Sequence, residues 1–504
     1  MRALANLPLA LHLTGVAGLA MMLPAAHALV AEDFHVARSF FYSGLLTLII
    51  TAFIGIAVNQ RHGAFSQREQ LATLVAAFTL LPLVLAVPLY EGSRNTTFLN
   101  AYFEMVSSLT TTGASLYEGT GQLTKSLHLW RGIVGWLGGL LIWVVAAATL
   151  APMNLGGFEI TTAAGGGEDV TLIRRGTRQR TPAGHIWYAL STLAPIYISL
   201  TLLLWVLLLV VGEDTLRGLM HAMGTMSTSG ITIVGHVTDD NAGLAAEVVI
   251  LFFFAFGISR LTFSRDVAGR RERLLTDPEV QMAGIIIIGL PMLLFLRHWI
   301  GAIEVNEHSD FTAGLLALWG SVFTVASFLT TTGYESVAWN EARDWSGLPA
   351  PGVVLIGLSI IGGGVATTTG GVKLLRVYAL YKHGVRELNK LVYPSSVAGM
   401  RAYGRRIHRQ GAFLAWLFFM LFALSIAAVM SLLTAFGVGF EEAMIFAVAG
   451  LSTTGQLAHA GADVPLTYAS LSDGAKLVVC FAMVLGRLEA LALIALFNPN
   501  FWRN

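Results

Sequence analysis

Apolar runs long enough to cross a bilayer recur along the whole chain. A helix rises about 1.5 Å per residue, so about 20 apolar residues cross the hydrocarbon core of a membrane. Backbone polar groups in that core must be satisfied internally, which restricts such a chain to helices or a closed barrel. The runs predict ten spanning helices, at residues 7–27, 36–58, 71–90, 131–152, 186–211, 245–263, 282–300, 351–380, 412–436 and 476–497.

Composition supports a membrane protein and excludes several other classes. Hydrophobic residues make up 55% of the 504 residues and charged residues 12%, which is too apolar for an ordinary soluble domain. The single cysteine, Cys480, excludes a disulfide framework and a cysteine metal site, and its apolar neighbours indicate packing. The sequence contains no P-loop, zinc-protease motif or hydrolase nucleophile motif. We therefore expect a protein that is not an enzyme.

The first apolar run has two interpretations. Arg2 precedes it and Ala26-His27-Ala28 resembles a cleavage site, as in a signal peptide. The run is long for the apolar region of a signal peptide, which favours a retained helix. The arrangement of the other spans is the same in either case.

Basic residues are concentrated in alternate linkers. Residues 59–70, 156–183, 259–281 and 373–410 are rich in arginine, whereas the linkers between them lean acidic. Because arginine and lysine favour the cytoplasmic ends of membrane helices, this pattern predicts ten spans with both termini in the cytoplasm. Nucleic-acid binding is a weaker interpretation for such short linkers, and we expect no nucleic-acid partner.

One short motif occurs four times between spans. A half-apolar stretch too short to cross a bilayer follows spans three, five, seven and nine, and each stretch ends in hydroxyl residues followed by glycine. One such cluster is ordinary turn chemistry, but four on one predicted face of the membrane indicate re-entrant pore loops. The motifs are Leu109-Thr110-Thr111-Thr112-Gly113-Ala114 (loop 1), Met226-Ser227-Thr228-Ser229-Gly230-Ile231 (loop 2), Leu329-Thr330-Thr331-Thr332-Gly333-Tyr334 (loop 3) and Leu451-Ser452-Thr453-Thr454-Gly455-Gln456 (loop 4).

Four such loops around one axis can form a cation filter. Non-helical backbone at membrane depth is tolerated where it lines a watery cavity, and rings of carbonyl oxygens can replace the hydration shell of a cation. Glycine can adopt φ > 0 and turn its carbonyl inward, while hydroxyl side chains can hydrogen-bond behind the filter. The helix before each loop directs its negative C-terminal end toward the cavity. We expect the nearby Glu118 and Glu335 to be solvated charges at the mouth.

The residues around loop 1 resemble a known family. Phe103 to Ala114 read Phe-Glu-Met-Val-Ser-Ser-Leu-Thr-Thr-Thr-Gly-Ala, and Trp130-Arg131 and Trp136-Leu137-Gly138-Gly139 follow in the next span. Over essentially its full length the chain resembles the Trk/Ktr/HKT superfamily of potassium transporters. Two helices before the first unit, and Gly486-Arg487-Leu488-Glu489 in the last span, make it most similar to the bacterial TrkH/TrkG membrane subunits.

The resemblance implies an all-α polytopic membrane protein. Four M1-pore loop-M2 units would surround one central pore with pseudo-fourfold symmetry, preceded by two extra N-terminal transmembrane helices. The expected divisions are an N-terminal helix pair at 1–65 and pore units at 66–160, 161–270, 271–395 and 396–504. The resemblance also implies a homodimer in the bacterial inner membrane, gated by a cytosolic TrkA-like ring of RCK domains that carries the nucleotide.

The resemblance further implies that the backbone around each filter glycine binds potassium, the transported ion. Relatives with serine in place of the first filter glycine admit sodium, so Gly113 argues for potassium. Passive flow and proton symport both stay open, as does the choice between a TrkH-like and a TrkG-like protein. The expected filter residues are Thr111, Thr112, Gly113, Thr228, Ser229, Gly230, Thr331, Thr332, Gly333, Thr453, Thr454 and Gly455.

Two features inside the membrane suggest a gate. Residues 362–371 interrupt the eighth span with five glycines and three threonines. This predicts an unwound loop, with a glycine-rich helix contact as the alternative. Arg487 lies eleven residues after Lys476, about 16 Å into its span, where charge is costly. The resemblance implies that the loop obstructs the pathway and that the arginine repels ions there, whereas a structural ion pair with Glu489 or Glu104 is the alternative. The expected gate residues are Gly362, Gly363, Gly364, Thr367, Thr368, Thr369, Gly370, Gly371 and Arg487.

Some segments depart from the family pattern. Loops 2 and 4 are less regular than loops 1 and 3, and linker 161–180 matches nothing in the family. A basic run in the linker before the ninth span is expected to contact the regulator, with membrane anchoring as the alternative. This run contains Arg401, Arg405, Arg406 and Arg409.

Two other classes of protein need consideration. A secondary carrier would use inverted repeats around a midplane substrate site, whereas these four repeats share one orientation. A membrane-embedded lipid-modifying enzyme would need acids or histidines clustered near one membrane face, and the sequence has no such cluster. Rubidium uptake by cells without potassium systems of their own discriminates a potassium pore from both.

Overall fold

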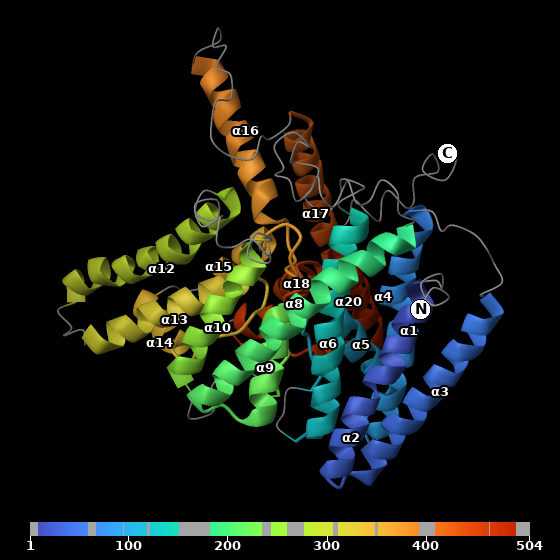
Figure 1. Cartoon of the computed structure of the whole chain (residues 1–504). Coiled ribbons are helices and arrows are strands. Elements are labelled where there is room, and N and C mark those ends of the chain that lie inside the picture. Colours follow the sequence, from blue (N-terminus) through green and yellow to red (C-terminus); the bar gives the residue numbers. More distant parts are fainter. Residues whose placement is uncertain are drawn as a thin grey trace.

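The computed structural model describes residues 9–58, 67–93, 95–117, 121–150, 182–233, 243–259, 277–305, 311–347, 351–392, 409–462 and 464–489. Within these ranges all regular secondary structure is helical (Figure 1). This confirms the predicted all-α class. Helices satisfy their own backbone hydrogen bonds, which is the condition that a bilayer imposes.

An N-terminal helix pair packs at one edge of the molecule (Figure 1). Helices α1 (Leu9–Ala20) and α2 (Met22–Val30) form one apolar span, and α3 (Phe34–Val58) returns beside it. The two spans approach closely at Gly18, where a Cβ would lie 3.2 Å from the Gly44 carbonyl oxygen. The outer face of α3 is apolar and exposed, with Phe53 and Ile56 more than two-thirds accessible, as expected for a helix that contacts lipid.

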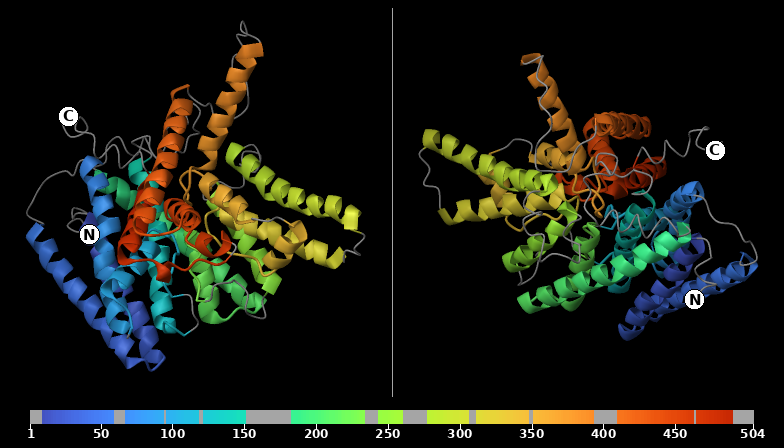
Figure 2. Two further views of the ribbon diagram at one scale, coloured as in Figure 1. Left: turned by 180° about the vertical axis from the view of Figure 1, so that it is seen from behind. Right: turned by 45° about the horizontal axis from the view of Figure 1, so that its top comes forward.

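The other helices repeat one order four times. A long helix is followed by a short helix that ends at a filter loop, and a third helix returns beside the loop; Figure 2 shows these groups around a common centre. The long helices are α4 (Gln67–Gly92), α8 (Pro182–Val211), α12 (Pro278–Val305) and α17 (Arg409–Ala435). The pore helices are α5 (Phe98–Leu109), α9 (Thr215–Ser227), α13 (Phe311–Leu329) and α18 (Phe440–Leu451). The third helices are α6 (Lys125–Val145), α10 (Gly243–Ile258), α15 (Pro351–Ile361) and α20 (Asp473–Leu488).

Five further elements complete the described part of the chain. The π-helical turn η2 (Ala146–Leu150) extends α6, and α14 (Trp339–Ser346) follows loop 3. After loop 4 come α19 (Leu457–Ala460) and the 3-10 turn η5 (Tyr468–Ser470). Helix α16 (Leu374–Val392) projects from the body at the top of Figure 1. It joins the interior of the molecule to the outside.

Seven helices in the described ranges are long and apolar enough to cross a membrane, and they coincide with seven of the ten predicted spans. The other three predicted spans coincide with the shorter helices α10, α15 and α20. Helix α15 ends at Ile361, where the glycine-rich segment begins, so the predicted unwinding of the eighth span is confirmed. Helix α20 ends before Glu489, whose φ is 59°. Residues 260–263 and 490–497, the ends of two predicted spans, lie outside the described residues.

Candidate ion pathway

Each of loops 1 to 4 begins with the same helix-capping turn. In loop 1 the Thr111 N–H donates to the Ser108 carbonyl and the Thr112 N–H to the Ser107 carbonyl, both at 2.9 Å, and the other loops repeat this pattern. It is a Schellman arrangement, which needs a left-handed residue at its centre. The left-handed residues are Thr111, Thr228, Thr331 and Thr453, with φ between 51° and 55°. The sequence predicts left-handed backbone at the glycines, and these threonines are additional left-handed positions.

Hydroxyl side chains pair within each loop. The Oγ to Oγ distances are 2.8 Å for Thr110 and Thr112, 2.9 Å for Ser227 and Ser229, 3.1 Å for Thr330 and Thr332, and 3.2 Å for Ser452 and Thr454. The pairing requires a hydroxyl at two positions separated by one residue, which explains why each loop carries serine or threonine at both. The expected hydroxyl hydrogen bonds therefore occur within each loop, between the two hydroxyl residues.

Three of the four filter glycines adopt the expected left-handed backbone. Their φ angles are 74° at Gly113, 59° at Gly230 and 82° at Gly333. The expectation is wrong for Gly455, which lies outside that region. The Gly455 N–H donates to the Thr112 carbonyl at 2.6 Å, and its own carbonyl accepts the Tyr468 hydroxyl at 2.9 Å. These two bonds hold the backbone at Gly455 in a conformation that differs from that of the glycines in loops 1 to 3.

The four loops touch one another in cyclic order. A Cβ built on Gly113 would collide with loop 2, one on Gly230 with loop 3, one on Gly333 with loop 4, and one on Gly455 with loop 1. The partners of the four glycines are Ser229, Thr332, Gln456 and Ala114 respectively. The loops therefore form a closed ring in the order 1, 2, 3, 4, in which loops 2 and 4 are diagonal.

The left-handed threonines contribute a set of buried hydroxyl groups. Among the described residues, the hydroxyls of Thr111, Thr228 and Thr453 are buried and have no hydrogen-bond partner, whereas that of Thr331 accepts the Gly370 N–H at 2.8 Å. Leaving a buried polar group unpaired costs roughly 1–3 kcal/mol. Because these hydroxyls come from the same position of four loops, they are suited to ligate a cation or its water.

The intramembrane loop, residues 362–371, leaves and rejoins the helices through a narrow neck. The Val372 N–H donates to the Ile360 carbonyl at 2.8 Å and the Leu374 N–H to the Gly363 carbonyl at 2.9 Å. At the neck Gly362 and Gly371 have φ of 69° and 76°, and a Cβ on Gly371 would lie 2.8 Å from the Gly362 Cα. The neck therefore requires glycine at both ends of the loop, at Gly362 and at Gly371.

The intramembrane loop contacts the ring of filter loops. Gly370 lies between Thr331, whose hydroxyl it bonds, and loop 4, because a Cβ on Gly370 would collide with the Ser452 carbonyl. The Thr368 hydroxyl donates to the Met226 carbonyl at the end of α9, at 3.3 Å. The loop therefore touches the second, third and fourth units.

Arg487 binds the intramembrane loop. It is 5% exposed, and its Nη1 donates to the Thr368 carbonyl at 2.6 Å. A cavity of about 30 Å³ beside this contact is lined by Lys373 and Glu489 among others. Such a volume holds about one water molecule and is too small for a hydrated cation.

The carboxylate partners considered for Arg487 are bound to other residues. Glu489 pairs with Arg376 at 2.7 Å, and Glu104 pairs with Arg131 at 2.7 Å. Arg376 is fully buried, with its guanidinium 3.7 Å from the centre of the Phe418 ring. Its assignment to a cytoplasmic linker is therefore wrong, because α16 begins directly at the neck and its first turn is still buried.

Lys373 was also assigned to that linker, and this assignment is wrong for the same reason. Lys373 is 5% exposed, and its Nζ donates to the Thr369 carbonyl within the loop. On the other side of the loop the buried Glu279 accepts the Val365 N–H at 2.8 Å. Charged side chains therefore form hydrogen bonds with the loop backbone at Val365, Thr368 and Thr369.

Buried carboxylates also hold the segments that follow loops 1 and 3. Glu104 accepts the Leu116 N–H at 2.6 Å, and Glu247 of α10 accepts the Val337 N–H at 2.7 Å. Glu247 is a site residue that is absent from the sequence predictions, although an acid inside an apolar helix is a signal for a role. Glu335 is not the solvated charge that was expected, because its side chain is 11% exposed and its Oε1 lies 3.0 Å from His459 Nδ1.

Several predicted features lie outside the described residues. These are Glu118, the linker 161–180 and the residues Arg401, Arg405 and Arg406, while the side chain of Arg409 is not described.

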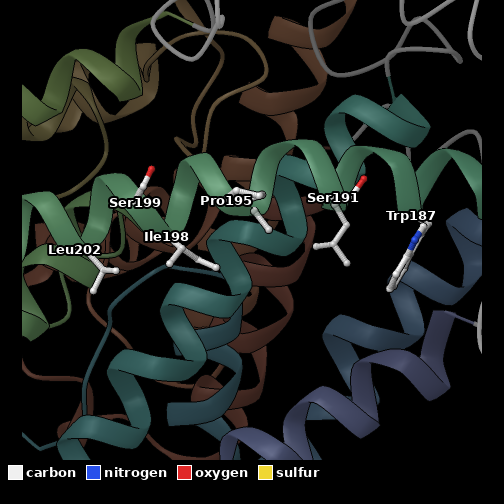
Figure 3. A pocket seen from close by; sticks show the side chains of 8 residues that line it. Trp187, Ser191, Pro195, Ile198, Ser199 and Leu202 are labelled. Carbon is white, nitrogen blue, oxygen red and sulfur yellow. The ribbon is translucent and has the colours of Figure 1, made fainter. Parts of the chain in front are cut away.

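The structure does describe a groove of about 440 Å³ along α8, lined by side chains between Trp187 and Leu202 (Figure 3). Its lining includes no charged side chain, so it supplies no strong ligand for a cation.

The fold and the ring of loops define a class: an all-helical, polytopic membrane protein with four pore-loop units around one pore. Within this class the chain belongs to the TrkH family of cation transport proteins, whose family model matches residues 37–504. Trk system potassium uptake protein TrkH of Escherichia coli K12 is 27% identical over 96% of both chains, and TrkH of Halomonas elongata is 30% identical over 88% of both.

A solved structure and a further relative agree with this assignment. The crystal structure of the potassium transporter TrkH from Vibrio parahaemolyticus matches 98% of both chains with a TM-score of 0.79 and 26% identity. The Escherichia coli TrkG protein is 27% identical over 87% of this chain and 86% of its own. These relatives are transport proteins and not enzymes, in agreement with the sequence analysis.

Proposed function

We propose that this protein takes up potassium across the bacterial inner membrane through a selectivity filter formed by loops 1 to 4. The observation that carries the proposal is the closed ring, in which each glycine abuts the next loop and each loop has the same cap and hydroxyl pair. Carbonyl and hydroxyl oxygens in such a ring can replace the hydration shell of potassium. The names of the relatives supply the choice of potassium.

The intramembrane loop and Arg487 are proposed as the gate. Their mutual hydrogen bond, and the loop contacts with Thr331 and Met226, support a barrier on the α16 side of the ring. A fixed guanidinium there also repels an approaching cation. A cytosolic TrkA-like regulator with nucleotide-binding RCK domains would open the gate by moving α16, whose first residues close the neck of the loop.

The proposed assembly is a homodimer with both termini in the cytoplasm, next to the regulator. The arginine-rich linkers support this orientation. Nucleotide would bind to the regulator and not to this chain. Flux through proteoliposomes under separate voltage and pH gradients decides the energetics: flux that follows voltage alone assigns a passive pore, and flux driven by the pH gradient assigns proton symport.

Rubidium uptake by cells that lack their own potassium systems tests the proposal. Cells with this protein and its regulator should accumulate rubidium above the level of cells with an empty vector, and external potassium should compete. A secondary carrier for another solute or a lipid-modifying enzyme predicts no uptake. Absence of uptake with the protein present in the membrane overturns the potassium function.

A further inference from the structure

Gln456 is the polar exception among the residues that follow the four filter glycines. The matching residues of loops 1 to 3 are Ala114, Ile231 and Tyr334, and each is buried. The Gln456 side chain instead donates from Nε2 to the Gly230 carbonyl at 3.0 Å and to the Gly113 carbonyl at 3.4 Å. Its amide therefore bonds two of the oxygens that the proposed filter offers to a cation.

The cyclic order of the loops shows where this side chain runs. Gln456 belongs to loop 4, and Gly230 belongs to the diagonal loop 2. A side chain that begins on one loop and hydrogen-bonds the diagonal loop has to cross the middle of the ring. A Cβ on Gly333 would lie 2.8 Å from the Gln456 Cβ, so Gln456 also packs against loop 3. It touches all three other loops.

The backbone of loop 4 makes room for this arrangement. The Gly455 carbonyl accepts the Tyr468 hydroxyl at 2.9 Å. Tyr468 is 2% exposed and packs on Phe103 and Phe446, which belong to the pore helices behind loops 1 and 4. The carbonyl of Gly455 therefore points behind the ring. The amide of Gln456 occupies the central side that this carbonyl leaves.

We propose that Gln456 is an affinity-determining residue of the filter, whose amide nitrogen competes with an incoming monovalent cation for the carbonyls of Gly113 and Gly230. This rests on the proposed filter function. The amide N–H groups satisfy these carbonyls when no cation is bound, and the cation has to displace them to be coordinated. Alanine, isoleucine and tyrosine at the matching positions offer no equivalent donor on the axis.

Two variants of nearly the same length test the competition. Gln456→Met keeps the aliphatic stem and removes the donor, and Gln456→Glu replaces the donor with a charged acceptor. The measurement is the external rubidium concentration that gives half-maximal uptake in cells without other potassium systems. Gln456→Met should lower it by about threefold to tenfold, the loss of roughly one net hydrogen bond, and Gln456→Glu should lower it further. Equal amounts of protein in the membrane are the control.

Two measurements can overturn the inference about Gln456. An unchanged or raised half-maximal concentration in Gln456→Met overturns the inference. Where a variant fails to reach the membrane, structures of the wild-type protein in potassium-free and potassium-rich buffer replace the uptake assay. The amide should leave both carbonyls in potassium, and an amide that stays bonded to them in both buffers overturns the inference. Failure of the filter function itself is distinct, because the wild-type protein would then take up no rubidium.

Discussion

Gly113 leaves no space for a side chain, because its φ is 74° and a Cβ would collide with the Ser229 carbonyl. Left-handed backbone costs an L-residue about 1–2 kcal/mol, and the collision displaces loop 2 as well. We expect Gly113→Ser to lower the ratio of rubidium to sodium uptake, because the loop 1 part of the proposed carbonyl ring is disturbed.

Gly437 supplies the matched control for this prediction. Its φ is 87°, and a Cβ there would meet nothing within 4 Å. Gly437→Ser therefore carries similar backbone strain without the collision and should leave the uptake ratio unchanged. An unchanged ratio in Gly113→Ser as well would remove Gly113 from the filter.

Tyr468 fixes the direction of the Gly455 carbonyl by a single hydrogen bond of 2.9 Å. Tyr468→Phe keeps the packing on Phe103 and Phe446 and loses about 0.5–1.5 kcal/mol from the missing bond. The freed carbonyl can turn toward the ring, so we expect a lower ratio of rubidium to sodium uptake with normal amounts of protein in the membrane. A wild-type ratio would indicate that packing alone orients loop 4.

At the scale of elements, several hydrogen bonds hold the intramembrane loop, and the bond from Arg487 to Thr368 is a charge-assisted one. Such a bond contributes about 1.5–3 kcal/mol, which is roughly a tenfold to hundredfold change in the ratio of closed to open states. Arg487→Ala should therefore raise the open probability in single-channel records without the regulator. Arg487→Lys keeps the positive charge and an N–H donor group, so its open probability should lie between those of the wild-type protein and Arg487→Ala.

The outcome for ion choice separates this gate from the filter. Arg487→Ala should leave the ratio of rubidium to sodium uptake unchanged, because loops 1 to 4 keep their contacts. A wild-type open probability in the absence of the regulator would place the gate elsewhere.

The same elements show what sequence reasoning could reach. The hydroxyl pairs and the unwound segment 362–371 follow from local composition, since serine, threonine and glycine act on backbone within a few residues. The direction of Gly455 and the role of Glu247 do not, because Tyr468 and Val337 reach them across 13 and 90 residues. The left-handed threonines were missed because residue preferences alone favour glycine at such a position.

At the scale of the whole molecule, apolar length and the fourfold motif were enough to predict an all-helical pore protein. Length alone misjudged the third helix of unit three, because the glycine-rich segment ends α15 at Ile361, and α20 ends at Leu488 before the left-handed Glu489. Both interruptions lie where Arg376 of α16 meets Glu489. The ends of α15 and α20 therefore lie at the proposed gate, where a continuous helix could not move as a loop can.

The last prediction joins the cytoplasmic surface to this gate. Arg405 and Arg406 belong to the basic run expected to contact an acidic surface of the regulator. Reversing both charges to glutamate should weaken co-purification with the regulator and reduce regulator-dependent rubidium uptake, while the protein still inserts in the membrane. Replacing both with lysine keeps the charge and should preserve both properties. Adding Arg487→Ala to the charge-reversed protein should restore uptake without restoring binding, because the loop no longer needs to be pulled open.

Normal co-purification of the charge-reversed protein would leave these arginines only the role of membrane anchors. Reduced uptake that Arg487→Ala fails to restore in the charge-reversed protein would show that the regulator acts on a different gate.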